Sequence, residues 1–145
     1  MADPTIEVVA GGPTPSKAAP VVLGAVAFGK PKPTTRDHPL SGDESCNALL
    51  GAFHASGGRE LDTSRVYQNG NCEEVIGRIP AGPSVRVGTK YHPSLEGGPV
   101  QQLEQSLHAL QRDSVSIYYI HMPSTEIPLE DTLAEINQCH AAGQF

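Results

Sequence analysis

The sequence predicts an α/β fold built from four consecutive strand–helix units, on the strength of three observations. Short apolar segments rich in β-branched residues alternate with longer segments in which apolar residues recur at helical spacing. The expected strands begin near residues 21, 59, 85 and 115, so their starts lie about 26 to 38 residues apart, the length of a βαβ crossover unit. Strands that alternate with helices are parallel and are joined by right-handed crossovers, with helices covering the sheet.

The first unit follows a segment of low complexity. Residues 1–19 are rich in Pro, Gly, Ala and Ser and are expected to form a flexible leader, and residues 21–29 form a short apolar strand that ends in glycine. The prolines and lysines of residues 29–40 indicate a loop. Residues 41–44 have the spacing of a capping box, and a glycine pair at 57–58 ends the helix that follows. The apolar positions of this helix recur at helical spacing: Ala48, Leu49, Ala52 and Phe53.

The remaining three units are shorter and more regular. Strands are expected at 60–63, 85–89 and 115–120, and helices at 73–79, from Pro99 onward and from Pro128 to Gly143. The last two helices each have an apolar stripe, formed by Val100, Leu103, Leu107 and Leu110 in one and by Leu129, Leu133 and Ile136 in the other.

The composition excludes several classes of protein. A chain of 145 residues that is 38% hydrophobic is large enough to bury a core. The net charge of −6 argues against nucleic acid as a partner, and no apolar run approaches the roughly 20 residues that span a membrane. The N-terminus lacks the basic and apolar regions of a secretory signal. The three widely spaced cysteines fit reduced thiols in a cytoplasmic protein better than a disulfide framework or a metal site.

Ionisable side chains mark the ends of three successive strands. Asp62 ends the second expected strand, Lys90 the third and His121 the fourth, and Tyr67 follows in the loop after Asp62. Because the active sites of parallel α/β folds lie at the carboxyl ends of the strands, these four side chains are expected to meet.

The chemistry of this set is that of a proton donor. Lys90 beside Asp62 would form a partly buried ion pair, and a cation near a phenol stabilises the phenolate, which makes Tyr67 a candidate general acid. A neutral His121 could donate a hydrogen bond to a carbonyl oxygen. A polarised carbonyl beside an acid lacks only a hydride, which a nicotinamide cofactor could supply.

These residues stand in segments that resemble those of the aldo-keto reductase family. Residues 61–67 are similar to its D-T-A-x-x-Y segment, residues 88–90 to its T-K and residues 118–121 to its Y-x-x-H. Residues 23–25 resemble its L-G-T turn with alanine in place of threonine, and residues 128–133 resemble the start of its fourth helix. The nearest likeness is to the branch that reduces aflatoxin dialdehyde and succinic semialdehyde.

The resemblance implies that residues 20–145 form half of a (β/α)₈ TIM-type barrel, truncated before the fifth strand. It also implies an NADPH-dependent oxidoreductase that reduces a small carbonyl substrate. In that family pattern Tyr67 is the general acid, Lys90 activates it, Asp62 pairs with Lys90 and contacts the nicotinamide ribose, and His121 orients the carbonyl. Further residues are assigned by position, Gly24 and Ala25 to the cofactor and Phe28, Tyr91 and Met122 to the substrate wall.

Alternatives to this activity follow from what the resemblance does not cover. The family's fifth to eighth strands supply most of its cofactor site, and the chain has no G-x-G-x-x-G fingerprint, so these residues alone are expected to be weakly active or inactive. A second hypothesis is a non-catalytic half-barrel, either an interaction or regulatory module or a degenerate product, whose open sheet edges favour self-association. A third treats Lys90 as the Schiff-base lysine of a barrel aldolase or lyase.

Overall fold

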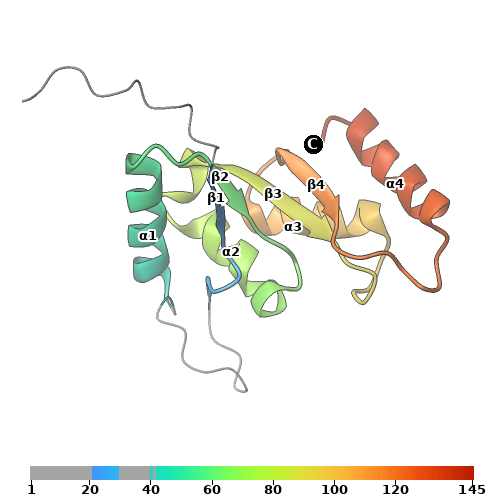
Figure 1. The fold of residues 1–145 in the computed structure, drawn as a ribbon, viewed down its shortest axis with the longest axis horizontal. Helices are drawn as coiled ribbons and strands as arrows, with labels where there is room; N and C mark the ends of the chain where they lie inside the picture. The colour runs from blue at the N-terminus through green and yellow to red at the C-terminus, as the bar shows by residue number, and fades with distance from the viewer. Residues whose placement is uncertain (1–20, 30–39, 41) are drawn as a thin grey trace, which may run out of the picture.

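Four strands and four α-helices alternate along the described part of the chain (Figure 1). The computed structural model describes residues 21–29, 40 and 42–145. The predicted leader at 1–19 and most of the loop before Leu40 therefore lie outside the described residues. The elements are β1 (Val22–Gly24), α1 (Asp43–Ala55), β2 (Glu60–Asp62), α2 (Asn71–Arg78), β3 (Arg86–Tyr91), α3 (Pro99–Leu110), β4 (Ile117–Ile120) and α4 (Leu129–Ala141), with short 3-10 helices η1 (Tyr67–Gly70) and η2 (Gly82–Ser84).

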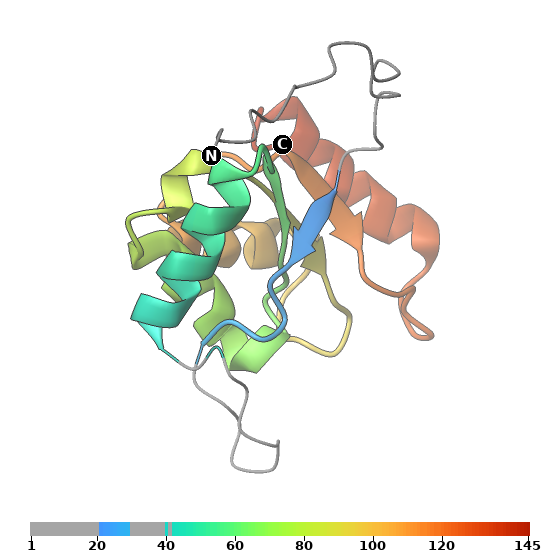
Figure 2. The same ribbon diagram turned by 60° about the vertical axis from the view of Figure 1, so that its left-hand side comes forward.

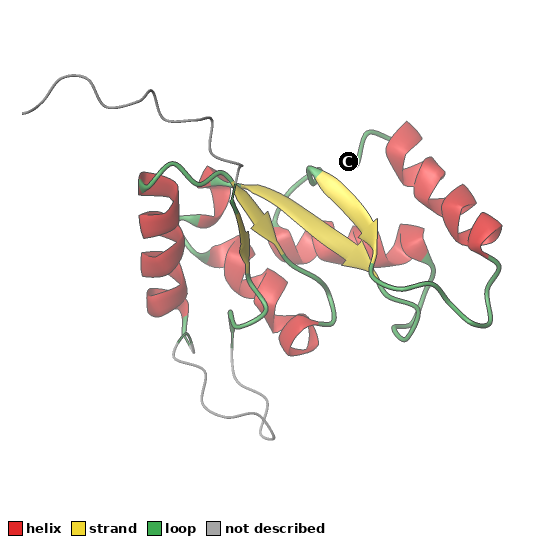
Figure 3. Cartoon of the chain, viewed as in Figure 1, coloured by secondary structure: helices red, strands yellow, loops and turns green. Residues whose placement is uncertain are grey.

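The strands form one parallel sheet in chain order, β1-β2-β3-β4 (Figure 3). The pairing register sets Gly24 opposite Asp62, Asp62 opposite Gly88 and Lys90 opposite Tyr119. The predicted α/β class with four parallel βα units is confirmed. The carboxyl ends of all four strands consequently lie at one edge of the sheet.

The helices cover one face of this sheet (Figure 2). Side chains alternate along a strand, so every second residue points toward the helices. Among those that do so, Val87 and Tyr91 of β3 and Tyr118 of β4 are buried in the core, together with Leu103 of α3. On the other face Val22, Ile117 and Tyr119 remain 48%, 39% and 43% exposed, which leaves an apolar surface.

Close packing of α2 on α3 depends on a glycine. A Cβ built at Gly77 of α2 would overlap the carbonyl oxygen of Ala109 on α3. The two helices therefore approach at a distance that no larger side chain permits at this position. The predicted apolar stripe of α3 faces this contact and the sheet, with Leu103, Leu107 and Leu110 buried.

Two details of the first unit differ from the expectation. β1 is three residues long because the chain turns at residues 25–28. The first residue of the expected capping box, Ser41, lies outside the described residues; α1 begins at Asp43 with Gly42 as its N-cap and no side-chain cap hydrogen bond from that residue. Acidic Asp43 and Glu44 instead lie in the first turn, where the helix dipole favours negative charge.

The apolar faces of the two outer helices also differ from the expectation. In α1 Cys46 and Leu50 are buried, whereas Ala48 and Ala52 are exposed and Leu49 and Phe53 are partly buried at the margin of the core. In α4 the buried positions are Thr132 and Cys139, and Leu129 and Leu133 are each 48% exposed. The reason is that α4 packs mainly on α3, which fixes the buried side and leaves part of its apolar stripe in solvent.

No helix among the described residues is long and apolar enough to cross a membrane.

Candidate active site

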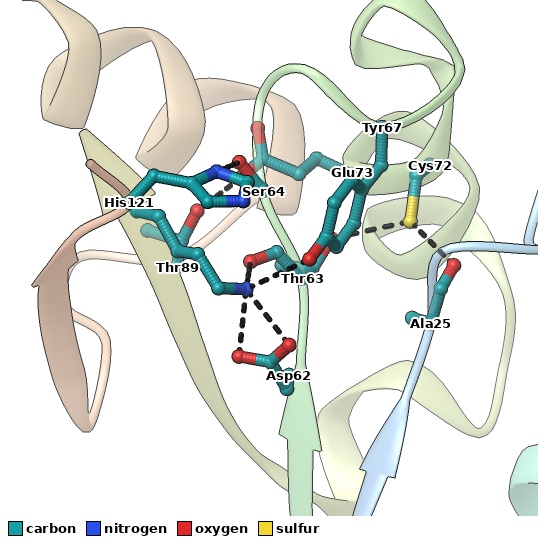
Figure 4. Close-up of polar contacts among 10 residues, drawn as sticks. Ala25, Asp62, Thr63, Ser64, Tyr67, Cys72, Glu73, Thr89 and His121 are labelled. Carbon is teal, nitrogen blue, oxygen red and sulfur yellow. Dashed lines mark hydrogen bonds and ion pairs between the residues drawn. The ribbon is translucent and has the colours of Figure 1, made fainter. Parts of the chain in front are cut away.

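The structure brings Asp62, Tyr67, Lys90 and His121 together at the carboxyl edge of the sheet (Figure 4). Asp62 is the last residue of β2, Lys90 lies one residue before the end of β3, and His121 directly follows β4. Tyr67 begins η1, in the loop between β2 and α2. Adjacent parallel strands end side by side, so the strand order that the sequence predicts is enough to collect these groups.

Lys90 is the centre of the group. Its ammonium donates to the Asp62 carboxylate at 2.7 Å, to the carbonyl oxygen of Thr63 at 2.6 Å and to the Tyr67 hydroxyl at 3.2 Å. An ammonium has three protons, so these acceptors use all of them. The Lys90 side chain is 13% exposed and that of Asp62 31%, so the pair is partly screened from water. The cation is thus held in one place, against the phenol oxygen.

His121 lies edge-on to the tyrosine. The two ring centroids are 5.8 Å apart with the rings perpendicular, and the His92 ring lies 5.1 Å from His121 on another side. Burial lowers the pKa of His121, the charges of Lys90 and His92 lower it further, and Asp62 acts in the opposite direction. A lowered pKa favours the neutral imidazole, the form in which one ring nitrogen donates and the other accepts a hydrogen bond.

A buried carboxyl lies beneath the site. Glu73, in the first turn of α2, is fully buried, accepts a 2.6 Å hydrogen bond from the Thr89 hydroxyl and lies 3.4 Å from Arg65. Burial raises the pKa of Glu73, although Thr89 and Arg65 both counteract that rise. No sequence pattern singled out this residue, since an acidic residue in the first turn of a helix is ordinarily exposed.

A thiol joins the same helix to two strand ends. The Cys72 thiol lies 3.1 Å from the Thr63 hydroxyl and donates to the carbonyl oxygen of Ala25 at 3.0 Å. Burial raises its pKa to about 12, so the thiol stays protonated and can act as a donor. The start of α2 is thereby attached to the ends of β1 and β2, and the Tyr67 loop is held from below.

The loop that carries His92 is also anchored from within. Gln102 of α3 is 1% exposed; its side-chain oxygen accepts from the backbone N–H of His92 at 3.0 Å, and its amide nitrogen donates to the carbonyl oxygen of His92 at 3.0 Å and to that of Gly97 at 2.9 Å. His92 was not among the expected site residues, although its position two residues after Lys90 places it near the same end of β3.

The residues expected to line the cofactor and the substrate differ in their exposure to solvent. Gly24 borders open space, because a Cβ there would have no neighbour within 4 Å, and it pairs with Asp62. Ala25 and Phe28 are fully buried and Tyr91 is 1% exposed, so the structure places these three side chains in the core rather than on an exposed wall. Tyr91 follows Lys90 in β3 and must point to the opposite face. Met122 is 50% exposed just after His121.

Comparison with known proteins assigns the chain to a family of enzymes. Residues 20–145 match the model of the aldo/keto reductase family, which is a match to most of the chain. The chain belongs to the aldo/keto reductase family. Among curated relatives, human aflatoxin B1 aldehyde reductase member 4 is 36% identical over 141 residues, an alignment that covers 90% of this chain and 40% of that protein. The predicted likeness to the aflatoxin aldehyde reductases is confirmed.

Solved structures show the same relationship. A thermostable aldo-keto reductase in complex with the inhibitor epalrestat superposes with a TM-score of 0.70 at 28% identity, covering 87% of this chain and 47% of the other. An aldo-keto reductase from Klebsiella pneumoniae in complex with NADPH gives 0.68 at 26% identity, covering 85% of this chain and 42% of the other. The chain thus spans about two fifths of the curated relative and just under half of these solved reductases.

Proposed function

We propose that this chain carries the proton-donating part of an NADPH-dependent reductase that converts aldehydes or ketones to alcohols. The observation that supports this most directly is the Lys90 ammonium, which is bonded to the Asp62 carboxylate and lies 3.2 Å from the Tyr67 hydroxyl. A cation fixed at this distance stabilises the negative charge that develops on the phenol oxygen when the proton is transferred to substrate.

Each side chain then has a role in the reduction. His121 donates a hydrogen bond to the substrate carbonyl oxygen and orients it beside Tyr67. The nicotinamide, when bound, supplies a hydride to the carbonyl carbon. Tyr67 gives its proton to the oxygen, which becomes the alcohol, and Lys90 stabilises the phenolate that remains. Asp62 keeps Lys90 in position throughout.

The nicotinamide end of the cofactor fits the residues present. Gly24 borders open space where a side chain would intrude, and the neighbouring Asp62 carboxylate is partly exposed and can accept from ribose hydroxyls. The phosphates of the cofactor need cations to bind them. Two cations of the described residues at this end of the sheet, Arg65 and Lys90, are already ion-paired with Glu73 and Asp62. We therefore expect residues 1–145 assayed alone to turn over weakly or not at all.

The first test is to measure NADPH binding to the purified chain. The fluorescence of the cofactor reports the binding, and size-exclusion chromatography of the same sample reports the oligomeric state. Saturable binding supports the proposal and leads to an assay of NADPH oxidation with an aromatic aldehyde. Tyr67→Phe should then abolish turnover by at least about 100-fold. Tyr119→Phe, which removes a half-exposed hydroxyl outside the group of four, is the matched control and should retain it.

A folded chain that binds no NADPH contradicts the proposal for residues 1–145. Undiminished turnover by Tyr67→Phe would contradict the assignment of the acid. The Schiff-base alternative is disfavoured by the three hydrogen bonds that Lys90 donates, because a nucleophilic amine needs a free lone pair. Borohydride trapping with an aldehyde substrate would label Lys90 only if that alternative held.

Self-association is a second candidate property, and the second copy of this chain is the partner we propose. β1 and β4 are the outer strands of the described sheet, and its uncovered face exposes Val22, Ile117 and Tyr119. Two copies would supply eight strands, in keeping with the 47% of a solved reductase that one copy covers. Joining β4 of each copy to β1 of the other would remove both edges.

Sedimentation analysis at micromolar concentrations tests this pairing. The chain and the control Ala48→Asp, a change at an exposed site on α1, should be dimeric. Ile117→Asp, which places a charge on the uncovered face, should be monomeric and still folded. A monomeric unmodified chain would contradict the proposed pairing.

A further inference from the structure

The buried hydroxyl of Ser64 contacts His121 across the sheet. Ser64 lies just after β2, His121 lies just after β4, and β3 separates the two strands. Ser64 is fully buried, and its Oγ lies 3.2 Å from Nδ1 of His121, 57 positions further along the chain (Figure 4). Within the described part of the chain, His121 is the only hydrogen-bond partner of this hydroxyl. Ser64 stands where the D-T-A segment quoted above has alanine, which could not make this contact.

The direction of the hydrogen bond follows from the cost of an unsatisfied donor. If Nδ1–H donated to Ser64, the serine proton would be buried with no acceptor. If Ser64 donates to Nδ1, its proton is satisfied, and the ring keeps its own proton on Nε2. A buried donor without an acceptor has lost its hydrogen bonds to water and gained none in return, so the second arrangement is favoured.

The other groups around His121 do not compete for Nδ1. The Lys90 ammonium on β3 donates its three protons to Asp62, Thr63 and Tyr67. It therefore acts on the His121 ring only through its charge. His92 accepts from the backbone N–H of Ser94 at 3.1 Å through its own Nδ1 and meets His121 edge-on. Tyr67 likewise contacts the ring by its edge, and Asp62 acts on it through its charge.

We propose that Ser64 is a positioning residue that fixes His121 as the Nε2–H tautomer, with this N–H as the donor to the substrate carbonyl oxygen. The role toward the carbonyl rests on the reductase function proposed above. The tautomer itself does not, since it is a property of the folded chain without substrate. The two parts can therefore be tested separately.

The tautomer is measured by long-range ¹H–¹⁵N correlation NMR of the histidine rings, with His121→Gln to assign the His121 signals. The chain should show Nε2–H and an unprotonated Nδ1 at neutral pH. Ser64→Ala should give a mixture of tautomers and raise the pKa of His121, because a donor that stabilises the neutral ring is lost. Ser106→Ala, an equally buried serine on α3, should leave the His121 signals unchanged.

An Nδ1–H tautomer in the unmodified chain overturns the proposal whether or not any variant folds. So does a Ser64→Ala chain whose His121 tautomer and titration are unchanged. Ser64→Thr, which restores the hydroxyl, should return the Nε2–H form.

The kinetic consequence is measured separately as NADPH-linked aldehyde reduction. Ser64→Ala should lower kcat by about 10-fold or more, with little change in KM for NADPH. The reason is that a His121 ring that exchanges between its two tautomers no longer always presents Nε2–H to the substrate carbonyl oxygen. Absence of turnover in every variant, including the unmodified chain, is the outcome expected where residues 1–145 lack part of the cofactor site, and the NMR result alone then decides the proposal on the tautomer.

Discussion

The Lys90 ammonium reaches Tyr67 from the neighbouring strand, lying 3.2 Å from its hydroxyl oxygen and 4.8 Å from the centre of its ring. The contact is therefore with the oxygen edge of the phenol as well as its face. This geometry depends on two further groups, because the Asp62 carboxylate and the Thr63 carbonyl oxygen also accept hydrogen bonds from the Lys90 ammonium. Loss of any one contact is expected to affect the others.

Removing the cation should abolish the proton donor without unfolding the chain. Lys90→Met is expected to lower NADPH-linked aldehyde reduction by about 100-fold or more, because the phenolate loses its counter-charge. The partner carboxylate is partly exposed, so stability should change little. Arg86→Met is the matched control: Arg86 lies at the other end of β3, ion-paired with Glu60, and its loss should leave turnover intact. Equal losses in both variants would contradict the assignment.

The buried Glu73 carboxyl should make stability fall as pH rises. Burial favours its neutral form in the folded state and raises its pKa, so above the ordinary value of 4.5 the unfolded chain releases this proton more readily than the folded one. Urea unfolding at several pH values should show that Glu73→Gln gains stability, relative to the unmodified chain, as pH rises from about 5 to about 7. Glu74→Gln, at the exposed neighbouring position, should show no such trend.

The contact between α2 and α3 should not tolerate a methyl group. Gly77→Ala is expected to lower the free energy of unfolding by about 1–3 kcal/mol, because the new Cβ overlaps the Ala109 carbonyl oxygen. Gly51→Ala, in α1 with open space around it, should instead raise stability by up to about 1 kcal/mol. Chemical denaturation of both variants measures the difference, and a neutral Gly77→Ala would mean that the helices pack less closely.

The three thiols should be unreactive in the folded chain. All three cysteines are free and buried, and burial raises the pKa of each, that of Cys72 to about 12. A disulfide reagent such as Ellman's should therefore label none of them in buffer near neutral pH and all three in urea. Rapid labelling of one thiol in buffer would show local opening around it.

The sequence was sufficient for the strand order and for the meeting of Asp62, Lys90 and His121. Parallel βα units place successive strand ends side by side, so a residue's place at a strand end determines its neighbours. The same rule of alternation predicts that Tyr91, which directly follows Lys90, points to the helix-covered face of the sheet. The burial of Phe28 and Ala25 was not predicted, because β1 ends at Gly24 and the turn after it starts four residues earlier than the apolar run indicates.

Other features depend on tertiary packing that no local pattern records. Leu129 and Leu133 continue an apolar stripe, yet the angle at which α4 meets α3 buries Thr132 and Cys139 instead. The burial of Glu73 and the contact of Ser64 with His121 depend on partners 16 and 57 positions away. The serine at an alanine position was visible in the sequence, but its partner was not.

The pairing of β2 with β3 sets Asp62 opposite Gly88, two residues before Lys90. A shift of β3 by one residue would move the ammonium by about 3.3 Å and exchange the two faces of the strand. The lysine would then point into the helical layer, and Tyr91 would take its place at the rim. Chains that mispair these two strands would thus lose the contact between the Lys90 ammonium and the Tyr67 hydroxyl, so this contact is a local readout of whether β2 and β3 have paired in their native alignment.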